Sequence, residues 1–279
     1  MNRRKISTAT KIYFVFVAVF YAFLAQAKTI EINVWVHGTN PGPEKIWMHA
    51  SSPFRPWLYV EPGLNLALKL AENYYFNKLA HACAASNGSW NVDTFYTYGW
   101  PSTILSPKTR QIEGRKLFDQ LNKLIDSLGS DYDNIAVRLV GFSHGGNVIL
   151  NMISYLPFLR SDVELEIVFL GLPIQELTRE YVNSLFLKRV YSFYSESDWM
   201  QSLDIQKLQN SDANVPWFSK KTFLESDQVI QVKLTVNGSS IGHRDYRSIN
   251  HYLPRALKEL SEVLPEDQKS AHLQFDLLT

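Results

Sequence analysis

Residues 137–148 read VRLVGFSHGGNV. A mostly apolar run leads into Gly141, and Ser143 stands between that glycine and the pair Gly145-Gly146. The pattern Gly-x-Ser-x-Gly between an apolar strand and a helical segment predicts an elbow that projects the serine from the carboxyl edge of a sheet. Taken alone, three fixed residues would appear by chance in roughly one such chain in ten. The prediction therefore depends on whether the rest of the chain supplies partners for the serine.

Apolar runs and helical periodicity alternate along the chain. The sequence predicts strands at 30–36, 94–98, 135–140, 165–170, 189–195 and 229–236, and helices at about 64–84, 109–128, 147–156 and 246–263. The polar tail after Pro265 is expected to be loosely ordered. The alternation, with strands apolar enough to be buried on both faces, predicts an α/β protein with a mostly parallel central sheet flanked by helices on both faces.

The first 27 residues have the pattern of a secretory signal peptide. A basic leader without acidic residues precedes an apolar run at 12–25, and Ala25-Gln26-Ala27 fits a signal-peptidase site. At 14 residues the run is shorter than the roughly 20 that a membrane-spanning helix needs. We therefore expect cleavage after Ala27, a secreted or periplasmic protein, and a single domain over 28–279. The alternative is a membrane anchor formed by the uncleaved segment.

Composition narrows the classes of partner and cofactor. The leader holds four of the 28 basic residues and none of the 27 acidic ones, so the mature chain carries 24 − 27 = −3 charges, which gives no reason to expect a nucleic-acid partner. Cys83 is the single cysteine, so an intrachain disulfide is excluded. The histidines show no metal-ligand spacing, so we expect no metal site and no cofactor.

The segment 41–63 combines prolines with aromatic residues. Its five prolines exclude a helix or a central strand, and its aromatics are too many for a disordered linker. We expect an ordered, lid-like loop. Such a loop could present an apolar surface to an acyl chain and would allow transient contact with a membrane or lipid surface.

A serine hydroxyl is a weak nucleophile at neutral pH, so it needs a histidine base that is held by a carboxylate. In an elbow of this type the acid follows the serine and lies just beyond a strand. Asp198 comes three residues after the predicted strand 189–195 and is the favoured acid. Glu196 and Asp204 are its rivals, the first as an exposed turn residue and the second near the start of a short helix.

The base should follow the acid in the sequence and lie in a loop. His243 lies in the loop between the predicted strand 229–236 and the last helix. His251 is the rival, but it falls within that helix. The sequence therefore predicts the order Ser143, Asp198, His243.

Attack on a carbonyl creates an oxyanion, which backbone N–H groups must stabilise. The residue after the nucleophile, His144, should supply one donor through its backbone and not through its imidazole. His37-Gly38-Thr39 ends an early strand, and the N–H of Thr39 is the expected second donor.

With these residues the chain resembles the α/β-hydrolase superfamily. The resemblance covers nearly all of the mature sequence and runs through VWVHGTN (34–40), FYTYGWPS (95–102), LVGFSHGGNV (139–148), YSFYSESDWMQSLD (191–204) and GHRDY (242–246). The Ser-His-Gly-Gly elbow is similar to that of several bacterial lipases and esterases. The resemblance implies Ser143 as nucleophile, Asp198 as acid and His243 as base.

These features favour a secreted serine hydrolase that cleaves a small-molecule carboxylic ester or a lipid through an acyl-enzyme intermediate. Because one fold carries many chemistries, a peptidase, an amidase or a thioesterase is an alternative. A hydrolase-fold binding protein without activity is a further alternative, which an intact triad disfavours. The sequence does not indicate an oligomeric state.

Overall fold

The computed structural model describes residues 28–39, 60–86, 90–103, 106–129, 131–202, 204, 206, 216–223 and 226–278. The strands are β1 (Thr29–Val36), β2 (Gly63–Leu66), β3 (Phe95–Gly99), β4 (Asn134–Phe142), β5 (Val163–Leu170), β6 (Leu187–Tyr194), β7 (Val229–Val236), β8 (Ser239–Ser240) and β9 (Ala271–Leu277). The α-helices are α4 (Tyr75–Ala85), α5 (Pro107–Leu128), α6 (His144–Ile153), α8 (Tyr246–Ile249) and α9 (Leu253–Val263). The predicted signal peptide 1–27 and nearly all of the predicted lid 41–63 lie outside the described residues.

Within the described residues the strands form one sheet in the order β2-β3-β1-β4-β5-β6-β7-β8, with β9 also paired to β7. Strands β2 and β8 pair antiparallel with their neighbours, and the other pairs are parallel. The serine-bearing strand β4 lies in the interior of the sheet between β1 and β5. The predicted fold class, a mostly parallel sheet in an α/β protein, is confirmed.

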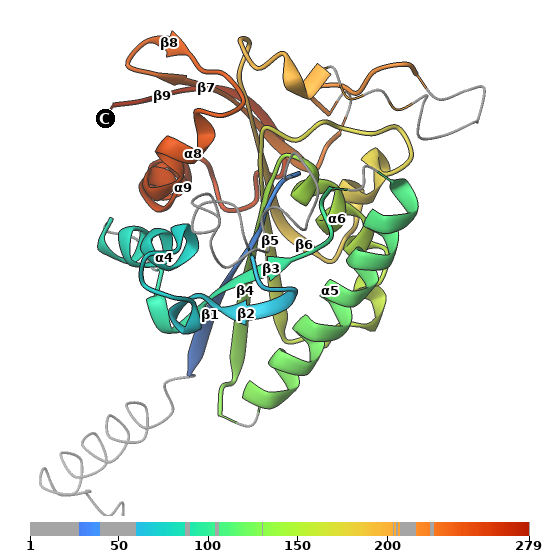
Figure 1. Ribbon diagram of the computed structural model, residues 1–279, viewed down its shortest axis with the longest axis vertical. Helices are drawn as coiled ribbons and strands as arrows, with labels where there is room; N and C mark the ends of the chain where they lie inside the picture. The colour runs from blue at the N-terminus through green and yellow to red at the C-terminus, as the bar shows by residue number, and fades with distance from the viewer. Residues whose placement is uncertain are drawn as a thin grey trace, which may run out of the picture.

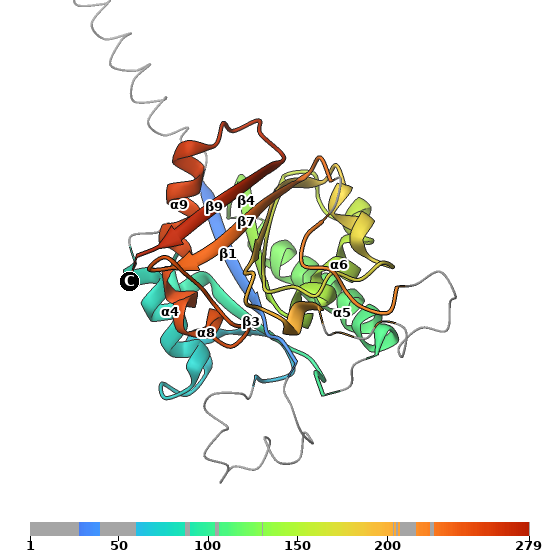
Figure 2. The same ribbon diagram turned by 90° about the horizontal axis from the view of Figure 1, so that it is seen from above.

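Helices cover both faces of the sheet. Figures 1 and 2 show α5 and α6 on one face and α4, α8 and α9 on the other. Alternate residues of one strand enter the two cores: in β1, Val34 and Val36 pack with α5 and α6, whereas Trp35 faces α4. Because side chains alternate along a strand and both faces are covered, the central strands need apolar residues at nearly every position.

The predicted helix over 64–84 is wrong in its first half. Residues 63–66 form β2, antiparallel to β3, and a short 3₁₀ turn at Ala67–Lys69 precedes α4. Gly63 has φ +83°, a left-handed conformation that starts the strand and that glycine adopts without strain. Pairing with the open edge of β3 satisfies backbone groups in a way that side-chain spacing does not reveal.

The carboxyl-terminal part also differs from the prediction. The expected helix over 246–263 is divided into α8, a 3₁₀ turn at Asn250–Tyr252 and α9. Pro254 in the first turn of α9 lacks the N–H that would continue the preceding helix, so it starts a new one. The tail is not loosely ordered, because 271–277 forms β9 along β7, with Leu277 buried.

Candidate active site

The turn between β4 and α6 holds Ser143 in a strained backbone conformation. Its φ of 52° and ψ of −131° lie outside the regions that a residue with a side chain prefers. The Ser143 N–H donates to the carbonyl of Leu170 at 2.9 Å, and the N–H of Gly146 donates to the carbonyl of Ser143 at 3.0 Å. A strained residue that its surroundings hold on both sides is typical of a functional site.

The glycines of the elbow allow close backbone packing. A Cβ on Gly145 would lie 2.2 Å from the carbonyl oxygen of Val36, and one on Gly141 would lie 2.6 Å from the Cα of Gly146. The motif thus brings the start of α6 against the end of β1. A larger residue at these positions would push the two segments apart.

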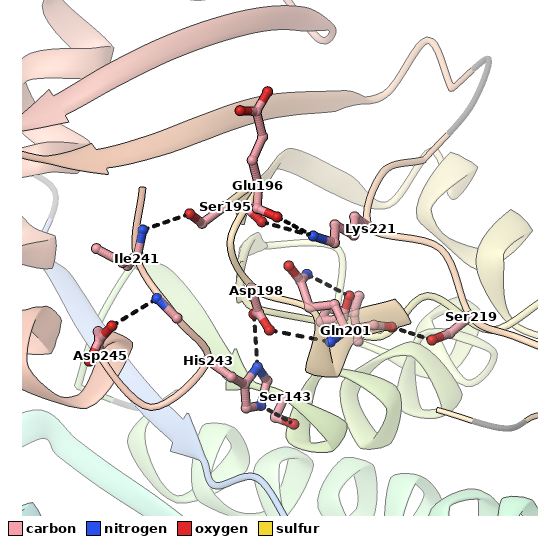
Figure 3. Close-up of polar contacts among 12 residues, drawn as sticks. Ser143, Ser195, Glu196, Asp198, Gln201, Ser219, Lys221, Ile241, His243 and Asp245 are labelled. Carbon is pink, nitrogen blue, oxygen red and sulfur yellow. Dashed lines mark hydrogen bonds and ion pairs between the residues drawn. The ribbon is translucent and has the colours of Figure 1, made fainter. Parts of the chain in front are cut away.

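The three predicted triad residues form one chain of hydrogen bonds (Figure 3). The Nε2 of His243 lies 2.9 Å from the Oγ of Ser143, and its Nδ1 lies 2.8 Å from the Oδ2 of Asp198. Asp198 is fully buried, and its Oδ1 accepts the N–H of Gln201 at 3.3 Å. Both carboxylate oxygens are therefore engaged, and one of them faces the ring nitrogen opposite the serine.

The rival acids have other partners. Glu196 is exposed and pairs with Lys233 at 2.6 Å, while Asp204 faces the imidazole of His144. The rival base His251 packs its ring against Tyr252, with ring centroids 3.9 Å apart. Of the candidates, the structure brings Ser143, Asp198 and His243 together.

A hydrogen bond that the sequence did not reveal joins the acid loop to the base loop. The hydroxyl of Ser195, at the end of β6, accepts the N–H of Ile241 at 2.9 Å (Figure 3). Within the base loop, the carboxylate of Asp245 accepts the N–H of Gly242 at 2.7 Å. The first contact joins the two loops, and the second closes the turn that contains His243. A serine in an apolar strand gives no sequence signal for such a role, because its partner is a backbone group 46 residues away.

The ring of His243 is held between aromatic groups. It stacks on Phe142, with ring centroids 5.1 Å apart, and meets Tyr246 edge-on. Burial, with the charge of Asp198 adding to it, raises the pKa of Tyr246 well above its usual value. The phenol is therefore neutral near pH 7. The packed rings restrict the imidazole of His243 to one orientation.

The loop that leads to the predicted donor Thr39 passes beside the serine. A Cβ on Gly38 would be 2.9 Å from the Cβ of Ser143, so the loop that continues to Thr39 passes directly beside the nucleophile. His144 is the first residue of α6, and a helix of this kind leaves its first N–H groups without intrahelical acceptors. The use of these two N–H groups by an oxyanion stays a prediction.

His37 anchors that loop. Its Nε2 accepts the N–H of Trp100 at 3.3 Å, and its carbonyl accepts the indole N–H of the same tryptophan at 2.8 Å. Its Nδ1 lies 2.7 Å from the carbonyl oxygen of Gly38, so the tautomer protonated on Nδ1 satisfies both ring nitrogens. Burial lowers the pKa of His37 to about 4, with the charge of Arg247 acting in the same direction. The ring is therefore neutral near pH 7.

In the part of the chain that the structure describes, no cluster of three or more His, Cys, Asp or Glu residues could hold a metal ion. The same residues include no helix with the length and hydropathy needed to cross a membrane.

No protein-family model matches the chain, and no curated protein matches it. Among solved structures, the chain is similar to a protein described as "Putative hydrolase from Agrobacterium vitis S4". That match has 11% identity, covers 89% of this chain and 80% of the other, and has a TM-score of 0.28. With a parallel sheet, a strained serine after β4, a buried aspartate after β6 and a histidine after β7, the chain has an α/β-hydrolase-type fold.

Proposed function

We propose that the protein is a serine hydrolase that cleaves carboxylic esters or lipids through an acyl-enzyme intermediate. The observation that carries this proposal is the unbroken chain of hydrogen bonds from Ser143 through His243 to the buried Asp198. Nucleophile, base and orienting acid within hydrogen-bond reach are the signature of an activated serine.

The proposed reaction has two halves. The Oγ of Ser143 attacks the carbonyl carbon while its proton passes to Nε2 of His243, and the oxyanion accepts backbone N–H donors from His144 and Thr39. Collapse breaks the bond to the alcohol, which takes the proton from His243. A water molecule then repeats the sequence on the acyl-enzyme and releases the acid. Asp198 orients the imidazole and stabilises the imidazolium.

Exposed apolar residues on segments near the acid support an apolar substrate. Four large side chains, which we call the acid-loop residues, are between 43% and 63% exposed: Trp199, Met200, Trp217 and Phe218. Trp199 directly follows Asp198, and the side-chain amide of Gln206 donates to the carbonyl of Phe218 at 2.9 Å. Exposed apolar groups of this kind gather where a protein meets a lipid, an acyl chain or another apolar partner. This favours an ester with an acyl chain over a peptide.

Labelling with a fluorophosphonate probe tests the activity. The wild-type protein should react with the probe, and the labelled protein should no longer hydrolyse esters. Ser143→Ala should neither react with the probe nor hydrolyse esters, and its melting temperature should equal that of the wild type. Ser154→Ala, which removes an exposed serine just after α6, should still label. Failure of the wild type to label and to hydrolyse short p-nitrophenyl esters would overturn the proposal.

A panel of matched substrates tests the class. We expect kcat/KM to rise with acyl length in p-nitrophenyl esters, and to exceed that for the matching anilide and thioester. If kcat/KM is higher for the anilide or for the thioester than for the ester, the protein is an amidase or a thioesterase instead of an esterase.

The place of action is part of the proposal. The basic leader, the apolar run and the Ala25-Gln26-Ala27 site within 1–27 support export with cleavage after Ala27. The mass of the N-terminal peptide of the exported protein tests this: a chain that begins at Lys28 supports it, and an intact leader indicates an anchor.

A further inference from the structure

A second histidine–aspartate pair lies beside the nucleophile elbow. The Nε2 of His144 is 3.4 Å from the Oδ1 of Asp204, and both side chains are buried. The Nδ1 of the same ring lies 3.3 Å from the amide nitrogen of Asn147, which also donates to the carbonyl of Pro173 at 2.9 Å. An imidazole protonated on Nε2 satisfies both neighbours. The ring next to Ser143 is thus held at both nitrogens.

Asp204 is itself held from the other side. Its Oδ2 accepts the amide of Gln175 at 2.9 Å, and Gln175 in turn accepts from the guanidinium of Arg110 at 3.0 Å. Arg110 is fully buried in α5, and its charge acts on Asp204. The network therefore ties His144 to α5 and to the segment after β5.

The charges in this network are well defined. Burial alone would raise the pKa of Asp204, but the contact with His144, the amide of Gln175 and the charge of Arg110 lower it to about 2. Burial lowers the pKa of His144, and the charge of Arg110 adds to this effect. Near pH 7 the pair is consequently a neutral imidazole that donates to an aspartate.

The same segment of chain reaches both sides of the elbow. Asp198 holds His243, and six residues later Asp204 holds His144. The intervening Gln201 bonds to Asp198 through its N–H and to the carbonyl of Leu172 through its side chain, at 3.0 Å. The contacts of Asp198, Gln201 and Asp204 therefore set the distance between the acid and the elbow.

We propose that Asp204, acting through the imidazole of His144, is a positioning residue that holds the backbone N–H of His144 toward the oxyanion. The inference rests on the proposed function. Because Ser143 has a strained backbone, its peptide link to His144 needs restraint from outside the turn. A side chain fixed at both ring nitrogens supplies that restraint, and a misaligned oxyanion donor lowers the rate of the chemical step more than it weakens substrate binding.

Three variants test the proposal on one p-nitrophenyl ester. His144→Leu removes the contact to Asp204, Asp204→Asn removes its charge, and His144→Gln keeps an N–H donor near the position of Nε2. We expect His144→Leu and Asp204→Asn to lower kcat about tenfold or more and to change KM by less than about twofold. The loss should be smaller than the factor of about 10²–10³ in kcat that removal of a whole oxyanion donor costs. His144→Gln should keep most of the wild-type kcat. The rate of fluorophosphonate labelling should fall in parallel with kcat.

Glu113→Gln is the matched control, because it removes another buried carboxylate whose partners are Tyr98 and Lys116. Its kcat should stay near the wild-type value, and comparing each variant's kcat at equal folded fraction separates positioning from stability. Wild-type kcat in Asp204→Asn and His144→Leu would overturn the inference, as would an equal loss in His144→Gln. A wild-type protein without labelling or turnover would instead overturn the proposed function itself.

Discussion

At the scale of single residues, the site depends on side chains that burial keeps in one charge state. His37 is neutral because its burial disfavours the imidazolium, and Asp204 is ionised because donors and Arg110 outweigh its burial. Each group anchors a loop next to Ser143. The polar groups around the nucleophile are therefore already in position before a substrate binds. Electrostatic stabilisation of a transition state is strongest when such groups need no rearrangement during the reaction.

His37 should make the protein less stable at acidic pH. The unfolded chain binds a proton on this imidazole below its ordinary pKa of 6.5, whereas the native state does so only below about 4. The unfolded state thus binds more protons between these values, so the free energy of unfolding should fall by about 3 kcal/mol as the pH drops from 6.5 to 4. Urea unfolding at several pH values measures this.

His37→Asn should flatten that pH dependence, while His81→Asn, at an exposed position of α4, should leave it as in the wild type. Equal slopes for His37→Asn and the wild type would show that this ring does not carry the effect.

At the level of secondary-structure elements, the elbow depends on close packing of β4, α6 and the end of β1, whose backbones are in direct contact. Gly145 lets α6 approach the carbonyls of Val36 and His37. The contact places the oxyanion loop beside the serine, so the same glycine serves both packing and the site. By contrast, Asn237-Gly238 between β7 and β8 has positive φ at both residues, and a Cβ on Gly238 would meet no atom within 4 Å.

Gly145→Ala should therefore damage activity far more than Gly238→Ala. The new methyl group at 145 must displace backbone by roughly 1 Å, and a misplacement of this size can cost about a hundredfold in rate. Gly238→Ala adds strain of about 1–2 kcal/mol at a turn where the new methyl group meets no atom within 4 Å. Ester turnover and melting temperature of both variants measure the difference. Comparable turnover in the two proteins would contradict the role of close packing at the elbow.

At the scale of the whole molecule, the last strand completes the sheet. β9 pairs with β7 from Ile230 to Val236 and packs Leu277 against the core that contains α8 and α9 (Figures 1 and 2). An uncovered β7 would expose a long edge, which invites aggregation. Because β7 leads into the base loop, order at this edge also supports the placement of His243.

Leu277→Ala and Leu278→Ala form a matched pair for this role, since the first side chain is 2% exposed and the second 66%. Leu277→Ala should lower the free energy of unfolding by about 2–4 kcal/mol, and Leu278→Ala by less than about 0.5 kcal/mol. Chemical denaturation measures both. Equal stability of the two variants would mean that β9 contributes little to the fold.

Much of this organisation can be predicted from local sequence. The apolar strands, the helical periodicity of 109–128, the glycine elbow and the order of serine, aspartate and histidine all follow from patterns within a few residues. They do so because side-chain alternation, capping and tight turns are short-range effects. The same reasoning placed Asp198 ahead of Glu196 and Asp204 as the acid.

Other features depend on partners far along the chain. β2 and β9 are strands because open edges of β3 and β7 accept them, and neither edge can be recognised in the segments themselves. The contact between His144 and Asp204, 60 residues apart, has the same origin. Backbone pairing and buried charge are satisfied across the whole molecule, so their partners emerge only when the sheet brings distant segments together.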